Sequence, residues 1–290
     1  MSSNETKANA ANVVEKRWII TVSILAVLMY LPTFRFLWEM WQQDTQYSLA
    51  YLVPFVCGYF VWKKWPEAKK LSRSPSRWGL TIIVVAIILH LTGVILDVSG
   101  PSALSIIILT LGGCIYFHGF GLVKLMAFPL AYMFFMIPVP GGVLDRLGFP
   151  MQIMASAATA SLLSLTGLEV VRAGIQLSVD GFSFEVAQAC SGMSSLVALV
   201  GVTAVFAYIT NLPPKLKWVL FFLALPIALI ANIVRITSIA LVGSYWDWGI
   251  ALRIYHDYSS PLLFLAAIVI LFFINWGFEW LNARTTPQSS

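Results

Sequence analysis

The fold is decided by the run Val186-Ala187-Gln188-Ala189-Cys190-Ser191-Gly192-Met193-Ser194-Ser195, which leads into Leu196-Val197-Ala198-Leu199-Val200 and stays apolar to Ile209. A long uncharged run of this kind predicts a membrane helix. Cys190 then lies at or near the N-terminus of that helix. The free backbone N–H groups and the helix dipole at an N-terminus favour negative charge, so they favour the reactive thiolate form of a cysteine there.

The composition excludes a soluble globular domain. Of the 290 residues, 59% are hydrophobic and 11% are charged, against about 25% charged residues in an average protein. We therefore predict an all-α polytopic membrane protein. The net charge of +5 indicates neither nucleic-acid binding nor a polybasic tail. Cys57 and Cys114 lie inside apolar runs, where we expect packing residues rather than a disulfide framework, and His90 is expected to be a hydrogen-bonded packing residue.

The apolar runs predict about eight transmembrane helices, judged against the roughly 20 residues that cross the hydrocarbon core. Their expected ranges are 18–37, 49–62, 78–96, 101–117, 121–137, 190–210, 216–243 and 260–281. One further segment, 143–166, is ambiguous because it contains Asp145, Arg146 and Gln152 among many small residues.

The basic residues decide which side of the membrane each loop faces. The segment 63–77 is rich in lysine and arginine, so it is cytoplasmic by the positive-inside rule. Alternation from there puts both termini in the cytoplasm and makes 143–166 an interfacial or re-entrant helix on the outer side. The chain is then a single transmembrane domain over 18–281 between tails at 1–17 and 282–290.

Residues 174–186 alternate apolar and polar side chains on each side of Asp180-Gly181. Asp-Gly between two alternating runs is typical of a β-hairpin with a two-residue turn. We predict a small extracytoplasmic β-hairpin that leads the chain into Cys190 and forms one wall of a site.

Two further groups join Cys190 at the outer boundary in this topology. Arg235 lies 18 residues beyond Lys217, which corresponds to a rise of about 27 Å in a helix. His256 lies in the outer connection 244–259. A thiol, a guanidinium and an imidazole from three separate segments are thus expected at one depth.

Each of these residues also has a structural interpretation. An arginine in a membrane helix is costly unless it is paired, so Arg235 is functional by default, and pairing with Glu185 or Asp247 is the structural alternative. For His256 the alternative is an interfacial histidine with Asp257 as its solvated neighbour.

The chain resembles the exosortase/archaeosortase family of integral membrane enzymes from about Tyr47 to the last helix. The matching stretches are Tyr51-Leu52-Val53-Pro54, Phe128-Pro129, Phe135-Met136-Ile137-Pro138-Val139-Pro140, Ala189-Cys190-Ser191-Gly192, Asn232-Ile233-Val234-Arg235-Ile236 and Tyr255-His256-Asp257. The chain departs from the family's pattern at Leu49-Ala50 and at Gln188.

The resemblance implies an eight-span enzyme whose Cys190, Arg235 and His256 face away from the cytoplasm. It implies exported substrate proteins that end in a sorting tail (PEP-CTERM-like), made of a short motif, a membrane helix and a basic cluster. A Cys190 acyl-enzyme would cleave near the motif, with or without transfer of the new C-terminus to an unknown acceptor nucleophile.

Further residues are expected to support this chemistry. Backbone N–H groups of Ser191 and Gly192 are candidates for holding an oxyanion. The polar side chains expected to position the three reacting groups are those of Glu185, Gln188, Asn232 and Asp257. We expect no cofactor, no metal and no nucleic-acid partner, and a multi-pass enzyme in contact with the lipid of a bacterial inner membrane, with its site on the periplasmic side.

Other functions make different demands on the sequence. Zinc, aspartyl and serine intramembrane proteases have motifs that we do not find in this chain. A transporter or lipid-handling protein would use Arg235 as a partner for substrate charge, but it predicts paired ionisable residues along several helices. A non-catalytic assembly protein would leave the thiol at a helix N-terminus unexplained.

Overall fold

The computed structural model describes residues 21, 24–43, 47, 49–139, 141–186, 193–251 and 256–285. Over these residues the chain is mostly helical, with one small three-stranded sheet. The chain divides into two compact units. The first comprises Met1–Met40 and Lys64–Leu130, and the second comprises Trp41–Lys63 and Ala131–Ser290.

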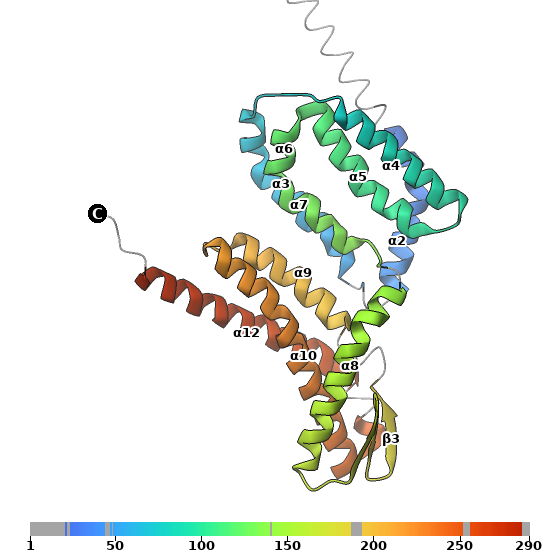
Figure 1. Cartoon of the computed structure of the whole chain (residues 1–290), viewed down its shortest axis with the longest axis vertical. Coiled ribbons are helices and arrows are strands. Elements are labelled where there is room, and N and C mark those ends of the chain that lie inside the picture. The colour runs from blue at the N-terminus through green and yellow to red at the C-terminus, as the bar shows by residue number, and fades with distance from the viewer. Residues whose placement is uncertain are drawn as a thin grey trace, which may run out of the picture. The chain divides into compact units, whose positions relative to one another are not determined.

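The first unit is an assembly of helices. Its elements are α2 (Leu31–Gln43, up to Met40), α4 (Trp78–Ile95), α5 (Ser99–His118), α6 (Phe120–Leu125) and the start of α7 (Ala127–Tyr132). Helices α4 and α5 pack along their length (Figure 1). A buried network of hydroxyl groups joins α2, α4 and α5 around Ser102, whose Oγ lies 2.7 Å from Nδ1 of His90 and 2.6 Å from Oγ1 of Thr33. His90 is thus the hydrogen-bonded packing residue that the sequence predicts.

The second unit contains both helices and the sheet. Its elements are η2 (Ala50–Leu52), the first part of α3 (Val53–Lys70), η3 (Met133–Met136), α8 (Gly141–Ser164), β1 (Val170–Ala173), β2 (Gln176–Val179), β3 (Phe182–Glu185), α9 (Met193–Ile209), α10 (Pro214–Tyr245), α11 (Trp248–Ile250) and α12 (His256–Thr285).

Four helices of the described chain are long and apolar enough to cross a membrane. They are α4, α5, α10 and the part of α12 from Pro261 to Arg284, which correspond to the predicted spans 78–96, 101–117, 216–243 and 260–281. A mostly helical membrane protein is therefore confirmed, whereas eight spans are not.

The other predicted spans differ from the helices that the structure shows. The run 121–137 is divided into α6, α7 and η3, and α9 offers a shorter apolar stretch, Leu196–Ile209. Helix α3 begins only at Val53 and continues through the basic segment to Lys70. The first predicted span begins before the described residues.

The ambiguous segment 143–166 forms one continuous helix, α8, which runs through Pro150. A re-entrant segment would need two arms joined by a reversal, and α8 has none. Helix α8 packs against α10 and against β1 and β2 instead. An interfacial helix remains the prediction for it.

The predicted hairpin is confirmed. Strands β2 and β3 are antiparallel and pair Val179 with Phe182 across the turn. Asp180 and Gly181 have φ values of 51° and 83°, which is the pair of positive φ angles that a type I′ turn requires. Strand β1 adds a third strand in the order β1-β2-β3. Its mostly exposed Val170–Ala173 has no periodic signal in the sequence.

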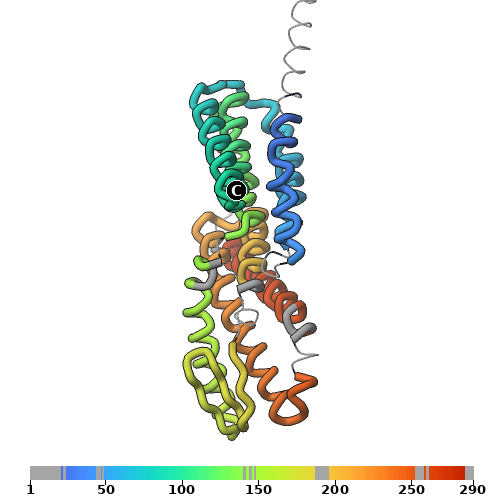
Figure 2. The backbone as a smooth tube through the Cα atoms, turned by 90° about the vertical axis from the view of Figure 1, so that its right-hand side faces the viewer, coloured from blue at the N-terminus to red at the C-terminus, as the bar shows by residue number. Residues whose placement is uncertain are grey.

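The inner face of the sheet packs on α8 and α10 (Figures 1 and 2). Leu177 and Val186 share a buried cluster with Ala155 of α8 and Ile236 of α10. A second cluster contains Leu163, Val179 and Ala240. Helix α10 has 32 residues, hence a length of about 48 Å, which exceeds a hydrocarbon core of roughly 30 Å. Its second half is the part that the sheet covers.

Candidate active site

Arg235 is buried inside α10, with 3% of its surface exposed. The helix runs without interruption from Pro214 to Tyr245. The predicted rise of about 27 Å from Lys217 to Arg235 therefore holds along a regular helix. An arginine is seldom fully buried unless its charge is compensated. The burial of Arg235 therefore indicates that neighbouring groups compensate its charge.

Asn232 lies one turn before Arg235 on the same face of α10. It is 4% exposed, and neither its Oδ1 nor its Nδ2 has a hydrogen-bond partner within the described part of the chain. A buried amide without partners costs free energy. Asn232 was predicted as a supporting residue, and its unsatisfied amide is an independent reason to look for a ligand or substrate group at this point.

Val186, the last described residue before the segment that contains Cys190, packs against this part of α10. Its side chain belongs to the buried cluster that contains Ile236, the residue after Arg235, and its N–H donates to the carbonyl oxygen of Ile175 at 3.0 Å. Residues 187–192 follow. Gln188, Cys190, Ser191 and Gly192 lie outside the described residues, and α9 begins at Met193.

The remaining predicted residues are described in part. Glu185 ends β3 and is exposed. His256 begins α12, next to Asp257, while the side chains of both lie outside the described set. The juxtaposition of Cys190, Arg235 and His256 therefore remains a prediction.

Trp248, shortly after the end of α10, makes a contact with strand β3 that sequence reasoning missed. Its indole ring stacks on Phe182 of β3, with 4.1 Å between ring centroids and 17° between ring planes. Gly243 makes room for it, because a Cβ atom there would overlap the indole ring. Asp247, a predicted alternative partner of Arg235, accepts a hydrogen bond from the N–H of Ile250 at 2.9 Å and so caps α11.

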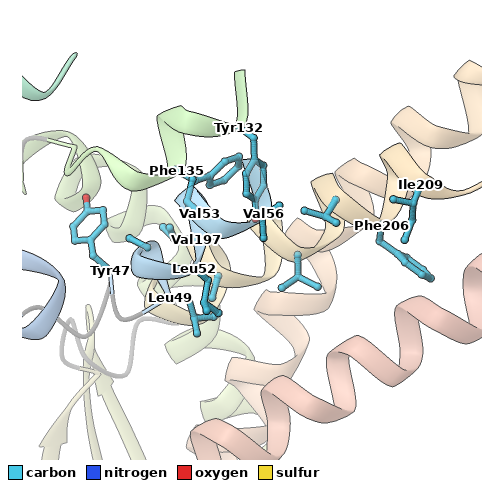
Figure 3. A pocket seen from close by; sticks show the side chains of 15 residues that line it. Tyr47, Leu49, Leu52, Val53, Val56, Tyr132, Phe135, Val197, Phe206 and Ile209 are labelled. Carbon is cyan, nitrogen blue, oxygen red and sulfur yellow. The ribbon is translucent and has the colours of Figure 1, made fainter. Parts of the chain in front are cut away.

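An apolar pocket of about 270 Å³ lies along α9 (Figure 3). One face of α9 lines it with Val197, Gly201 and Phe206, among others, and η2 and α3 contribute Leu52 and Val53. Tyr132 and Phe135 close it from α7 and η3. The pocket follows α9 from Val197 to Ile209, and α9 is the helix that comes after Cys190 in the sequence.

A polar cluster joins the far end of α9 to α12, and sequence reasoning missed it too. The hydroxyl of Thr210 lies 2.8 Å from Oδ1 of Asn275 and 2.8 Å from Oε1 of Glu279. The signal available in the sequence was an acidic residue, Glu279, within the last apolar run.

A comparison with known protein families shows to which family the chain belongs. The model of the family described as transmembrane exosortase matches residues 41–273, which is most of the chain. The chain belongs to the transmembrane exosortase family. The match covers Cys190, Arg235, His256 and the sheet, and it makes the exosortase a membrane protein of transpeptidase type. No curated protein and no solved structure matches the chain.

Proposed function

We propose that this exosortase is a membrane-embedded thiol protease or transpeptidase that cleaves the C-terminal sorting tail of exported proteins through a Cys190 acyl-enzyme. Family membership supports the type of enzyme. The observation that carries the residue assignment is the buried Arg235, whose neighbour Ile236 shares a cluster with Val186, four residues before Cys190.

The proposed reaction has two steps. His256 takes the proton of the Cys190 thiol, and the sulfur attacks the scissile carbonyl carbon. The tetrahedral intermediate collapses when the C–N bond breaks and His256 returns the proton to the leaving amine. The resulting thioester is attacked by water or by an acceptor amine, which releases Cys190 as a thiol.

Arg235 would stabilise the oxyanion of both tetrahedral intermediates. It stays protonated, so it acts as a fixed positive charge and not as a base. Buried charge acts through a low local dielectric, where its effect on a developing oxyanion is larger than in water. Backbone N–H groups at Ser191 and Gly192 would add donors. Glu185, Gln188, Asn232 and Asp257 are the residues proposed to position these groups.

The site is proposed to face the periplasm from a bacterial inner membrane, with both termini in the cytoplasm. Two observations support this. The segment 63–77 is strongly basic, as the positive-inside rule requires of a segment on the cytoplasmic side. Arg235 lies about 27 Å along α10 from Lys217, in the half of the helix that carries the sheet.

The substrate is proposed to be a protein that ends in a short motif such as Pro-Glu-Pro, a membrane helix and a basic cluster. Its membrane helix would lie against α9, where the apolar pocket can receive its side chains. The basic cluster would then remain on the cytoplasmic side.

A reporter protein with such a tail tests the proposal. It would be co-expressed with the wild-type chain, with Cys190→Ala, or with the double variant Cys57→Ala/Cys114→Ala, and its C-terminus would be read by intact-mass spectrometry. We expect loss of the tail with the wild type and the double variant, and an intact tail with Cys190→Ala. Any added mass identifies the acceptor. Processing that survives in Cys190→Ala would contradict the thiol mechanism.

A further inference from the structure

The outer edge of β3 presents backbone groups that no other strand of the described chain pairs. Strand β3 ends the sheet on one side. Val186 donates to Ile175, and Phe182 and Phe184 are paired with Val179 and Leu177 of β2. Because inward and outward backbone groups alternate along an antiparallel strand, the N–H and C=O groups of Ser183 and Glu185 point away from β2. Within the described residues, no strand pairs with them.

The two edges of the sheet differ in chemistry. On β1 the guanidinium of Arg172 donates to the carbonyl oxygen of Gly174 at 3.0 Å, so a long charged side chain lies along that edge. Strand β3, Phe182-Ser183-Phe184-Glu185, has neither lysine, arginine nor proline, and its one charged residue, Glu185, stands at its end. Lysine and proline are among the usual protections of an exposed edge, and an edge without them is open to an added strand.

The direction of strand β3 is toward Arg235. At its start Phe182 stacks on Trp248, and Phe184 packs with the cluster around Ala240. Just beyond its end, Val186 packs in the cluster around Ile236. The strand therefore runs back along α10 toward Arg235 and continues into the segment that contains Cys190.

We propose that the free edge of β3 binds the substrate as an added parallel strand, immediately upstream of the bond that Cys190 attacks. The reacting bond is taken from the proposed function. A substrate whose membrane helix follows that bond enters running toward the bilayer. This is the direction of β3 itself, so the added strand is parallel. A second copy of the chain, paired β3 to β3 across a two-fold axis, would be antiparallel.

Disulfide cross-linking tests this arrangement without needing cleavage. The full-length Cys190→Ala chain would carry Ser183→Cys, and single cysteines would be scanned through the reporter upstream of its motif. Under mild oxidation in membranes we expect cross-links at every second reporter residue, the period of a strand. When the enzyme's cysteine is moved to position 185 (Glu185→Cys), the reporter residue with the strongest cross-link should move by two residues toward the reporter's C-terminus.

The matched control is Val171→Cys. Val171, Ser178 and Ser183 lie in one cross-strand row, so Val171 occupies the same level and face on the opposite edge. Cys57 and Cys114 remain in every variant. We expect only background cross-linking from position 171.

Several outcomes overturn the proposal. Equal cross-linking from positions 171 and 183, a period of three to four residues, or a shift toward the reporter's N-terminus would each do so. Enzyme–enzyme cross-links at position 183 without reporter cross-links would indicate a second copy as the occupant. A strand pattern with a reporter that the wild type leaves uncut would retain strand addition and reject the proposed function.

A proline pair gives a second measurement. Ser183→Pro and Arg172→Pro each remove one outward N–H from an edge strand, a position where proline is tolerated. We expect reporter cleavage to fall about tenfold with Ser183→Pro, as the loss of about one hydrogen bond implies, and to change little with Arg172→Pro. Equal rates in the two variants would contradict the proposal.

Discussion

The indole ring of Trp248 stacks on the phenyl ring of Phe182, with 4.1 Å between their centroids. This contact joins two segments that are far apart in sequence. Phe182 begins the strand that leads toward Cys190, and Trp248 lies in the connection that leads to His256. One aromatic pair thereby joins strand β3 to the residues that follow α10, and these two described segments precede Cys190 and His256 in the sequence.

Replacing Trp248 should loosen both segments. We expect Trp248→Ala to lower the free energy of unfolding by about 2 kcal/mol, because packing area and a stacked pair are lost, and to reduce reporter cleavage. Trp246→Ala is the control, since Trp246 is 78% exposed. Thermal unfolding in detergent and intact-mass analysis of the reporter measure the two effects. Equal behaviour of the two variants would show that the stack carries no structural role.

Gly243 should tolerate no side chain. A Cβ atom at this position would overlap the ring of Trp248, so Gly243→Ala is expected to cost about 1–3 kcal/mol through overpacking. Gly277→Ala is its counterpart in α12, where, apart from the neighbouring backbone of the same helix, no atom of the described residues lies within 4 Å of the added methyl group. That variant should unfold at the same or a higher temperature. A drop of similar size in both would mean that helix packing, not the Trp248 contact, sets the cost.

The charge and the shape of Arg235 should both matter. Arg235→Lys keeps a positive charge but loses the planar fork of donors, and Arg235→Met removes the charge. If Arg235 stabilises an oxyanion, we expect Arg235→Met to slow cleavage by about 10²–10³, as the loss of one oxyanion donor does, and Arg235→Lys to retain part of the rate. Single-turnover rates on purified reporter measure this. Full activity in Arg235→Met would remove the residue from the mechanism.

A substitution of Asn232 distinguishes a structural role of its amide from a functional one. Its amide is buried with both polar atoms unsatisfied among the described residues, so Asn232→Leu should leave stability unchanged or raise it. If the amide positions substrate or reacting groups, cleavage should fall in the same variant. A lowered unfolding temperature would instead identify Asn232 as a residue with a structural hydrogen bond. The pair of measurements therefore assigns its role.

The Ser102 network should stabilise the first unit independently of the site. Ser102→Ala removes the partner of both His90 and Thr33 and leaves their polar atoms buried, at an expected cost of about 1–3 kcal/mol. Thr92→Val is the control, because Thr92 is exposed and its hydroxyl donates to the Ile88 carbonyl of its own helix. We expect its effect to stay within about 0.5 kcal/mol, measured by thermal unfolding.

Local patterns predicted a large part of this fold. Helices α4, α5 and α10 and the apolar part of α12 follow from uninterrupted apolar runs, and the β2–β3 hairpin follows from Asp180-Gly181 between alternating residues. The run 121–137 is not confirmed as a single span, because hydrophobicity reports affinity for lipid and not helix continuity, and the structure divides it into α6, α7 and η3. Strand β1 was missed because it is formed by pairing with β2, not by its own periodicity.

The sequence by itself determined the membrane class, the hairpin and the family, because apolar runs, turn residues and motif spacing are properties of short segments. Only the tertiary structure decided that Trp248 packs on Phe182 and that β3 runs back along α10, and that within the described residues Asn232 is buried without a partner and the outer edge of β3 is not paired. These features depend on side chains brought together from distant segments. Their energies come from packing and from hydrogen bonds made or left unmade, which no local pattern encodes.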